Sequence, residues 1–196
     1  MVLFLFFIME GFFMIQKTMA QGAEEGSYPK YSLSVSFDLE KNLLNGDAKI
    51  DLSKPANVFT GDLRILSMSL NGKPLDEKPA KGQVEVKEKG LLEIKYQKVS
   101  SGSYGSNPEN PGVVSGSVIS DKGISLTGNW YPSLEGLAFY DLSAVVPPDF
   151  SAISEADGIA SVKTPGGKQY IFSFPHPLGG IDLVAGPYVA TRSSIG

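Results

Sequence analysis

Residues 31–52 alternate between apolar and polar side chains with a period of two. The apolar positions form two runs: Leu33, Val35, Phe37 and Leu39, then Ala48, Ile50 and Leu52. Such alternation places successive side chains on opposite faces of a strand, with one face buried. Turn-forming residues stand between the runs, at Lys41 and Asn42 and again at Asn45 and Gly46. The pattern therefore predicts an antiparallel hairpin.

Short apolar runs of the same kind continue along the rest of the chain. They lie at residues 63–70, 84–86, 92–96, 118–119, 124–126, 139–146, 159–162, 170–174 and 181–185. Residues 100–116 are rich in Ser, Gly, Asn and Pro and predict a long loop, because strand patterning resumes after them. We expect helical turns only at residues 134–137 and 151–156. The pattern predicts an all-β fold, a sandwich or curved sheet of about ten or more strands with little helix.

The N-terminus has a different pattern. Residues 2–15 are almost entirely apolar, interrupted by Glu10 and Gly11. A membrane-spanning helix needs about 20 apolar residues, so this run is short for one. Thr18 and Ala20 then resemble the small residues that precede a signal-peptidase site. We expect residues 1–20 to form a signal peptide or membrane anchor and residues 21–30 a linker. The protein would then be secreted or periplasmic, and would touch a membrane only through this segment.

Composition agrees with many short strands joined by turns. The chain of 196 residues contains 22 Gly and 13 Pro, and its charged share of 19% is below the usual quarter or so. Its net charge is −4, and no cluster of Lys and Arg interrupts the sequence. Since phosphate backbones are bound by such clusters, we expect no nucleic-acid partner.

The chain lacks the residue patterns that a catalytic zinc site or a Ser-His-Asp triad would need. There is one histidine, His176, and no cysteine, whereas a catalytic zinc usually takes three protein ligands, commonly with two or more histidines. No Gly-x-Ser-x-Gly element supports a serine nucleophile. Pro175 and Pro177 hold the backbone of His176 extended, so a displayed turn histidine is expected. The acids at residues 24–25, 76–77 and 149–157 are read as solvated, loop or capping groups. We assign no catalytic residue, metal ligand or cofactor to this chain.

The densest aromatic motif is Asn129, Trp130, Tyr131 and Pro132, which contains the single tryptophan. In a strand, adjacent rings point to opposite faces, so one ring would enter the core and the other would face outward. Core packing and a contact surface both fit this motif. As a contact surface, these four residues would form a domain interface or the rim of a cleft.

Eight motifs follow one another in order from about residue 28 to about residue 190. They are Tyr31-x-Leu33-x-Val35-x-Phe37-Asp38, Leu44-x-Gly46-x-Ala48-x-Ile50, Leu66-x-x-x-Leu70-Asn71-Gly72 with Leu92-x-Ile94-x-Tyr96, Gly128-Asn129-Trp130-Tyr131-Pro132, Tyr140-Asp141-Leu142-x-Ala144-x-Val146-Pro147, Phe174-x-x-Pro177-Leu178, and Leu183-Val184-Ala185-Gly186-Pro187-Tyr188. In this order they resemble the N-terminal β domain of the zinc aminopeptidase family that includes alanyl aminopeptidase and leukotriene-A4 hydrolase.

The resemblance implies a saddle-like, mostly antiparallel β-sandwich that precedes a thermolysin-like catalytic domain. In that family the catalytic domain carries a Gly-x-Met-Glu-Asn element and binds zinc through His-Glu-x-x-His and a later Glu. None of these is present here, so zinc is expected only in a catalytic domain outside this chain. Family members also place an amide or acidic side chain near the substrate amine, just before the aromatic-Pro element. Residues 124–128 hold neither Gln nor Glu, which implies altered or lost aminopeptidase specificity.

The resemblance sets the expected organisation and function. Residues 31–191 would form one β-sandwich domain, and residues 192–196 would begin a linker to a missing catalytic domain. The chain would be the non-catalytic N-terminal domain of a zinc aminopeptidase-like protein, with the catalytic domain as its partner in cis or as a separate chain, or with self-association. The alternative is a secreted sandwich that binds carbohydrates or surfaces through Tyr104, Trp130 and Tyr131 as stacking platforms.

Overall fold

The computed structural model describes residues 28–76, 79–100 and 116–188. Within these ranges the elements are fourteen strands, with no helix, which confirms the predicted all-β class. Accordingly, no helix there is long and apolar enough to cross a membrane. The predicted signal peptide or anchor, Tyr104 and the predicted C-terminal linker lie outside the described residues.

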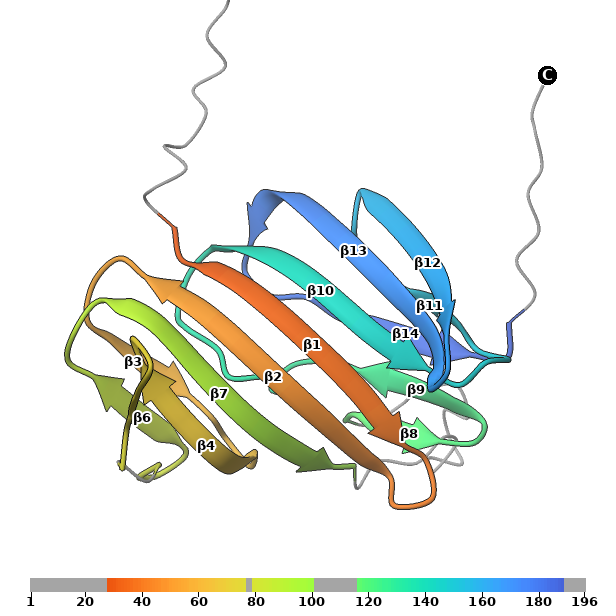
Figure 1. Ribbon diagram of the computed structural model, residues 1–196, viewed down its shortest axis with the longest axis horizontal. Coiled ribbons are helices and arrows are strands. Elements are labelled where there is room, and N and C mark those ends of the chain that lie inside the picture. Colours follow the sequence, from red (N-terminus) through yellow and green to blue (C-terminus); the bar gives the residue numbers. More distant parts are fainter. Residues whose placement is uncertain (1–27, 77–78, 101–115, 189–196) are drawn as a thin grey trace, which may run out of the picture.

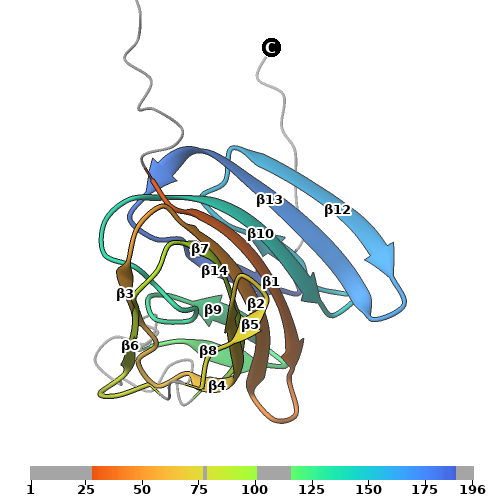
Figure 2. The same cartoon turned by 60° about the vertical axis from the view of Figure 1, so that its left-hand side comes forward.

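The largest sheet has eight strands, which can be followed in Figures 1 and 2. Their spatial order is β12 (Gly158–Thr164), β13 (Gly167–Leu178), β10 (Ala138–Val146), β1 (Lys30–Asp38), β2 (Leu43–Leu52), β7 (Gly90–Val99), β4 (Arg64–Leu70) and β5 (Lys73–Pro74). Neighbours are antiparallel except β1 and β10, which pair in parallel from Lys30 opposite Phe139 to Ser36 opposite Val145. The sheet is therefore mixed at its centre and antiparallel elsewhere.

The predicted hairpin is formed by β1 and β2, but one of its two turn signals was wrong. The chain reverses at residues 39–42, where Asn42 has a φ of 50°. Asn45 and Gly46 instead lie inside β2. Gly46 stands opposite Tyr96 of β7, and a Cβ on it would come within 2.2 Å of the Tyr96 ring. This glycine makes room for an aromatic side chain rather than a turn.

Two smaller sheets complete the fold. One has the order β11 (Ser151–Ile153), β14 (Leu183–Gly186), β9 (Gly123–Leu126) and β8 (Val118–Ser120); the other pairs β3 (Ala56–Phe59) with β6 (Gln83–Val86). The helical turn expected at residues 151–156 was wrong, because Ala152 is buried and pairs with Ala185 in strand register. Residues 134–137 form a bend rather than a helical turn.

The core lies between the inner face of the large sheet and the two small sheets, over which the large sheet curves (Figure 2). Strand β1 shows how the period-two pattern builds it: Tyr31, Leu33 and Val35 are buried, and the serines between them are exposed. The outer face of the large sheet carries ion pairs, such as Lys49 with Glu93 at 2.9 Å and Lys30 with Asp141 at 3.0 Å. Exposed ion pairs contribute little stability. They indicate that this part of the face is exposed to solvent.

Candidate functional site

The aromatic motif lies in an irregular segment that follows β9. Gly128 and Asn129 turn the chain with φ values of 52° and 39°, and Trp130 then enters the core, where it is fully buried. Its Nε1 donates a hydrogen bond of 2.8 Å to the carbonyl oxygen of Ile181. A buried indole N–H needs such a partner, so Trp130 fastens this segment to the residues before β14.

Tyr131 is also buried, with 5% of its surface exposed. Its hydroxyl accepts a hydrogen bond of 3.1 Å from the backbone N–H of Ile181 and lies 3.4 Å from the Tyr140 hydroxyl. Its ring stands edge-on to Trp130, with centroids 4.6 Å apart. The expectation that one of the two rings faces outward was wrong, because this segment is not a strand and its two rings are not forced to opposite sides.

Burial limits what the four residues can offer to a partner. Trp130, Tyr131 and Pro132 are buried, whereas Asn129 is exposed. Stacking on a sugar needs an exposed ring face, so neither Trp130 nor Tyr131 can act as the platform that the carbohydrate-binding alternative required. Of the predicted rim residues, Asn129 is the one placed to meet another molecule.

Asn129 lines a surface recess of about 470 Å³ together with Thr127, Gly128, Ser117, Lys98 and Asp62. The lysine and the aspartate pair with each other, and Ser100 donates a 2.6 Å hydrogen bond to the carbonyl of Ser117. The recess is thus of mixed polarity, and its lysine and aspartate neutralise each other. Thr127 and Gly128 end the stretch that the resemblance connects with substrate-amine binding, and they offer one hydroxyl and no carboxylate.

The outer face of the four-stranded sheet was missed by the sequence analysis. Strand register aligns one residue from each strand in a row across this face: Ile153, Val184, Ser125 and Val118. The neighbouring row, Ala152, Ala185, Ile124 and Ile119, is buried in the core, so the first row points away from it. Three of its four residues are apolar, but exposure falls along the row: Ile153 is 55% exposed, Val184 and Ser125 are half-buried, and Val118 is buried. The row could not be predicted from the sequence, because Ile153 belongs to β11, in a segment where a helical turn was expected.

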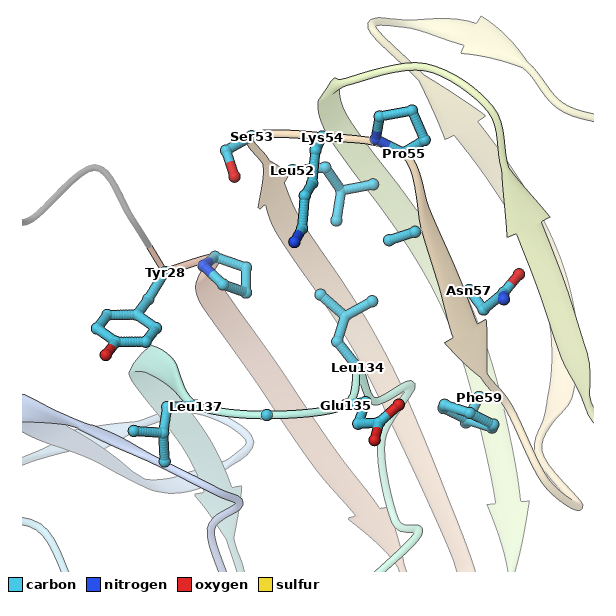
Figure 3. A pocket seen from close by; sticks show the side chains of 13 residues that line it. Tyr28, Leu52, Ser53, Lys54, Pro55, Asn57, Phe59, Leu134, Glu135 and Leu137 are labelled. Carbon is cyan, nitrogen blue, oxygen red and sulfur yellow. The ribbon is translucent and has the colours of Figure 1, made fainter.

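A second hollow, of about 450 Å³, lies between the β2–β3 connection and the loop before β10 (Figure 3). Lys54 comes from the first segment and Glu135 from the second, with Leu134 and Phe59 among the lining residues. At one end Phe59 and Ser133 exchange backbone hydrogen bonds of 2.8 and 2.9 Å. One lysine and one glutamate among walls of mixed polarity form no recognisable catalytic set.

The ionisable residues singled out in the sequence are scattered. His176 is exposed as expected, but it lies in β13 rather than in a turn. In this part of β13 the pairing with β10 shifts register, between Ala138 and Tyr140 of β10. Glu155 has a loop role, because its Oε1 accepts a 2.9 Å hydrogen bond from the backbone of Asp182. Among the described residues, no three His, Cys, Asp or Glu side chains gather into a group that could hold a metal ion.

Comparison with known proteins identifies the architecture. No family model and no curated protein matches the sequence. Solved structures do: an M1 zinc metallopeptidase from Deinococcus radiodurans is 18% identical with a TM-score of 0.63, and a mutant of it bound to a Tyr-Ser-Ala substrate has a TM-score of 0.62 at the same identity. A two-domain M1 zinc metallopeptidase mutant bound to L-arginine also matches at 18% identity and a TM-score of 0.62.

In each of these comparisons the match covers 80% of this chain and 41% of the metallopeptidase chain. This chain therefore corresponds to about two fifths of the length of those proteins. An identity of 18% establishes likeness of fold. The resemblance found in the sequence motifs is thus confirmed at that level: the protein has the β fold that makes up part of an M1 zinc metallopeptidase.

Proposed function

We propose that the chain is a non-catalytic N-terminal domain of a zinc aminopeptidase-like protein, which packs on a catalytic domain and walls one side of its substrate cleft. The fold likeness to part of an M1 zinc metallopeptidase carries this proposal. Zinc would be held by the catalytic domain. The apolar run at residues 2–15 supports export, with secretion or a membrane anchor as the outcome.

The accessible end of this row, formed by Ile153, Val184 and Ser125, is the surface that we assign to the catalytic domain. Around β1 and β2 the outer face of the large sheet is lined by serines and ion pairs, whereas this row is mostly apolar. Burying apolar area contributes roughly 25 cal/mol per Å², so contact here is favoured over contact on the polar face. Ser125 and Val184 sit next to each other in this row.

The recess at Asn129 is our proposed cleft rim. Thr127, Gly128 and Asn129 follow directly from β9, which contributes Ser125 to the apolar row. A domain seated on that row would therefore bring its own surface close to the recess. Because Thr127 supplies a hydroxyl where the resemblance would lead one to expect an amide or acid, a free substrate amine would be held weakly at this wall.

The surface assignment can be tested with an apolar fluorescent dye and sedimentation velocity on the full chain. We expect the chain to bind the dye, and the double substitution Ile153→Ser with Val184→Ser to reduce dye binding several-fold without changing the sedimentation of the chain. Leu66→Ser, at a residue 51% exposed on β4, is the matched control and should change neither. A monomer that binds no dye would remove the surface assignment.

The domain assignment has its own test. The coding sequence that follows Gly196 should encode His-Glu-x-x-His in the same frame, or a neighbouring gene should encode a catalytic subunit. The purified chain should release no amino acids from peptides, with or without added zinc. Release that a chelator abolishes would contradict a non-catalytic role, because the described residues offer no group for the metal.

A further inference from the structure

Strand β12 is the end strand of the large sheet and is accessible along its whole length. All seven of its residues pair with β13 on one side, and no described strand pairs with the other side. Six of the seven are exposed and Thr164 is half-buried. In both ribbon views β12 lies at the margin of the molecule opposite β3 and β6 (Figures 1 and 2).

The other described sheet edges are shorter, although β5 pairs only with Ser69 and Leu70 and leaves Arg64 to Ser67 of β4 without a described strand on that side. Strand β5 has two residues, one of them Pro74, and β8 and β11 have three each. Strand β3 is bridged to Ser133 on the side away from β6. Proteins commonly protect sheet edges by such shortening, by proline and by covering segments, because unpaired N–H and C=O groups recruit another strand. Strand β12 has none of these devices and a single charge, Lys163.

We propose that β12 is a self-association edge, through which two copies of the chain pair antiparallel about a two-fold axis at Ser161. Each large sheet would then continue into the other. This inference uses a different surface from the apolar row of the four-stranded sheet and does not depend on the proposed function.

The strand sequence is compatible with this register. In a two-fold antiparallel pair, facing residues must lie on the same side of the sheet, and centring on Ser161 pairs all seven residues. Ala160 then faces Val162 of the partner subunit, and Ile159 faces Lys163 of the partner subunit. No two like charges face each other. Centring on Lys163 would instead put two lysines directly opposite, which is destabilising.

Apolar contacts would continue across the new pair. On the outer side of the sheet Ala160 stands opposite Ile171 of β13, so the row would run from Ile171 through Ala160 to the partner's Val162. Ile171 is 50% exposed although β13 lies inside the sheet, and Val162 on the end strand is 52% exposed. Pairing would cover part of both, which supplies a hydrophobic contribution besides the backbone hydrogen bonds.

Charge also favours a second copy of the chain. Lys163 already stands opposite Lys168 on β13, so an acidic neighbour would relieve this repulsion. Asp157 directly precedes β12 and is exposed. In the Ser161-centred register the partner's Asp157 would lie diagonally across from Lys163, within reach of its long side chain.

The dimer should be concentration-dependent rather than obligate. Seven residues extend over roughly 24 Å of strand at about 3.4 Å each. An edge of that length buries less than the roughly 800 Å² per partner of a typical stable interface. We therefore expect a monomer–dimer equilibrium in sedimentation experiments, with dimers increasing as the protein is concentrated.

A cysteine at the proposed axis gives a position-specific test, because the chain has no cysteine of its own. Directly opposite residues in an antiparallel pair have Cα atoms about 4.5–5.5 Å apart, within the roughly 4.4–6.8 Å of disulfides. Mild oxidation of Ser161→Cys should therefore give disulfide-linked dimers on non-reducing gels. Ser34→Cys, at an exposed position on β1 in the middle of the sheet, should give several-fold fewer disulfide-linked dimers. Both variants retain residues 2–15, so any association through that segment contributes equally to both and does not affect the comparison.

Lysine substitutions at the same two positions test the non-covalent interface, without a disulfide cross-link. Ser161→Lys would place two lysines face to face at the axis, and the dimer dissociation constant should rise at least ~10-fold by sedimentation equilibrium. Ser34→Lys adds the same charge and should leave it unchanged. Circular dichroism and the unfolding midpoint verify that each variant is folded.

Several outcomes would overturn the self-association edge. One is a full chain that stays monomeric at every concentration, and another is equal cross-linking at positions 34 and 161. A third is association that Ile153→Ser abolishes and Ser161→Lys does not. That last result would place self-association on the four-stranded sheet, leaving the proposed function intact while removing this inference.

Discussion

Trp130 shows how one side chain joins two distant segments. Trp130→Phe removes the indole N–H and leaves the buried carbonyl of Ile181 without its donor. We expect the free energy of unfolding in urea to fall by about 1–3 kcal/mol, the usual cost of an unsatisfied buried group. Tyr188→Phe, at a residue 50% exposed, should stay within about 0.5 kcal/mol. Equal stabilities would mean that the bond to Ile181 contributes nothing.

The same residue provides a direct optical test of its burial. As the single tryptophan of a chain of 196 residues, Trp130 alone accounts for indole emission. Full burial predicts emission at short wavelength that iodide does not quench and that added sugars do not change. A red-shifted, sugar-sensitive emission would restore the carbohydrate-binding alternative.

Gly46 is a second residue whose role depends on its neighbour across the sheet. Gly46→Ala would force a methyl group to within 2.2 Å of the Tyr96 ring, and overpacking of this kind costs about 1–3 kcal/mol. The control Gly166→Ala has no heavy atom within 4 Å of the new Cβ and should be nearly neutral. Thermal unfolding of both variants provides the comparison, and equal midpoints would contradict the close packing.

At the scale of elements, the sequence predicts strands well where burial is one-sided and the strand is long. Strands β1, β2, β7 and β10 show clear alternation, and all four were located. Strands β3, β5 and β11 were missed; they have four residues or fewer, too few for a period of two to stand out. The equally short β6, β8, β9 and β14 were located from apolar residues that lie close together rather than from a long alternation. The turn predicted at Asn45 and Gly46 was wrong, because glycine occurs where a strand needs close packing as well as in turns.

Lateral order and register are the parts that alternation along the chain cannot supply. The apolar row on the four-stranded sheet takes one residue from each of four strands, which come from residues 118 to 186. Its members become neighbours only through pairing. The aromatic motif illustrates the same limit. Its sequence fitted both core packing and a contact surface, and its burial follows from contacts with Ile181, which lies far along the chain.

For the molecule as a whole, buried tyrosines couple stability to alkaline pH. Burial raises the pKa of Tyr31, Tyr96 and Tyr140 well above the ordinary value of about 10. Below pH 10 these hydroxyls are protonated in both the folded and unfolded states, so their effect on stability is constant. As pH rises past about 10, the unfolded chain loses protons that the folded chain keeps, and stability falls.

We therefore expect the free energy of unfolding to decrease between about pH 9.5 and 11, with buried tyrosinate absorbance appearing only together with unfolding. Tyr96→Phe should reduce this slope. It should also cost little stability at neutral pH, because the Tyr96 hydroxyl is buried with no hydrogen-bond partner among the described residues. A stability independent of pH in this range, or free titration of all eight tyrosines in the folded protein, would contradict the prediction.

The parallel pairing of β1 with β10 also dictates when the molecule can be completed during translation. Strand β1 ends at Asp38 and its parallel neighbour begins at Ala138, so the ribosome must add some hundred residues before the two can meet. At about 5–20 residues per second, that interval lasts roughly 5–20 s. Throughout it, the central strand of the finished sheet is an open margin of the nascent chain, and cellular chaperones would have their longest opportunity to bind there.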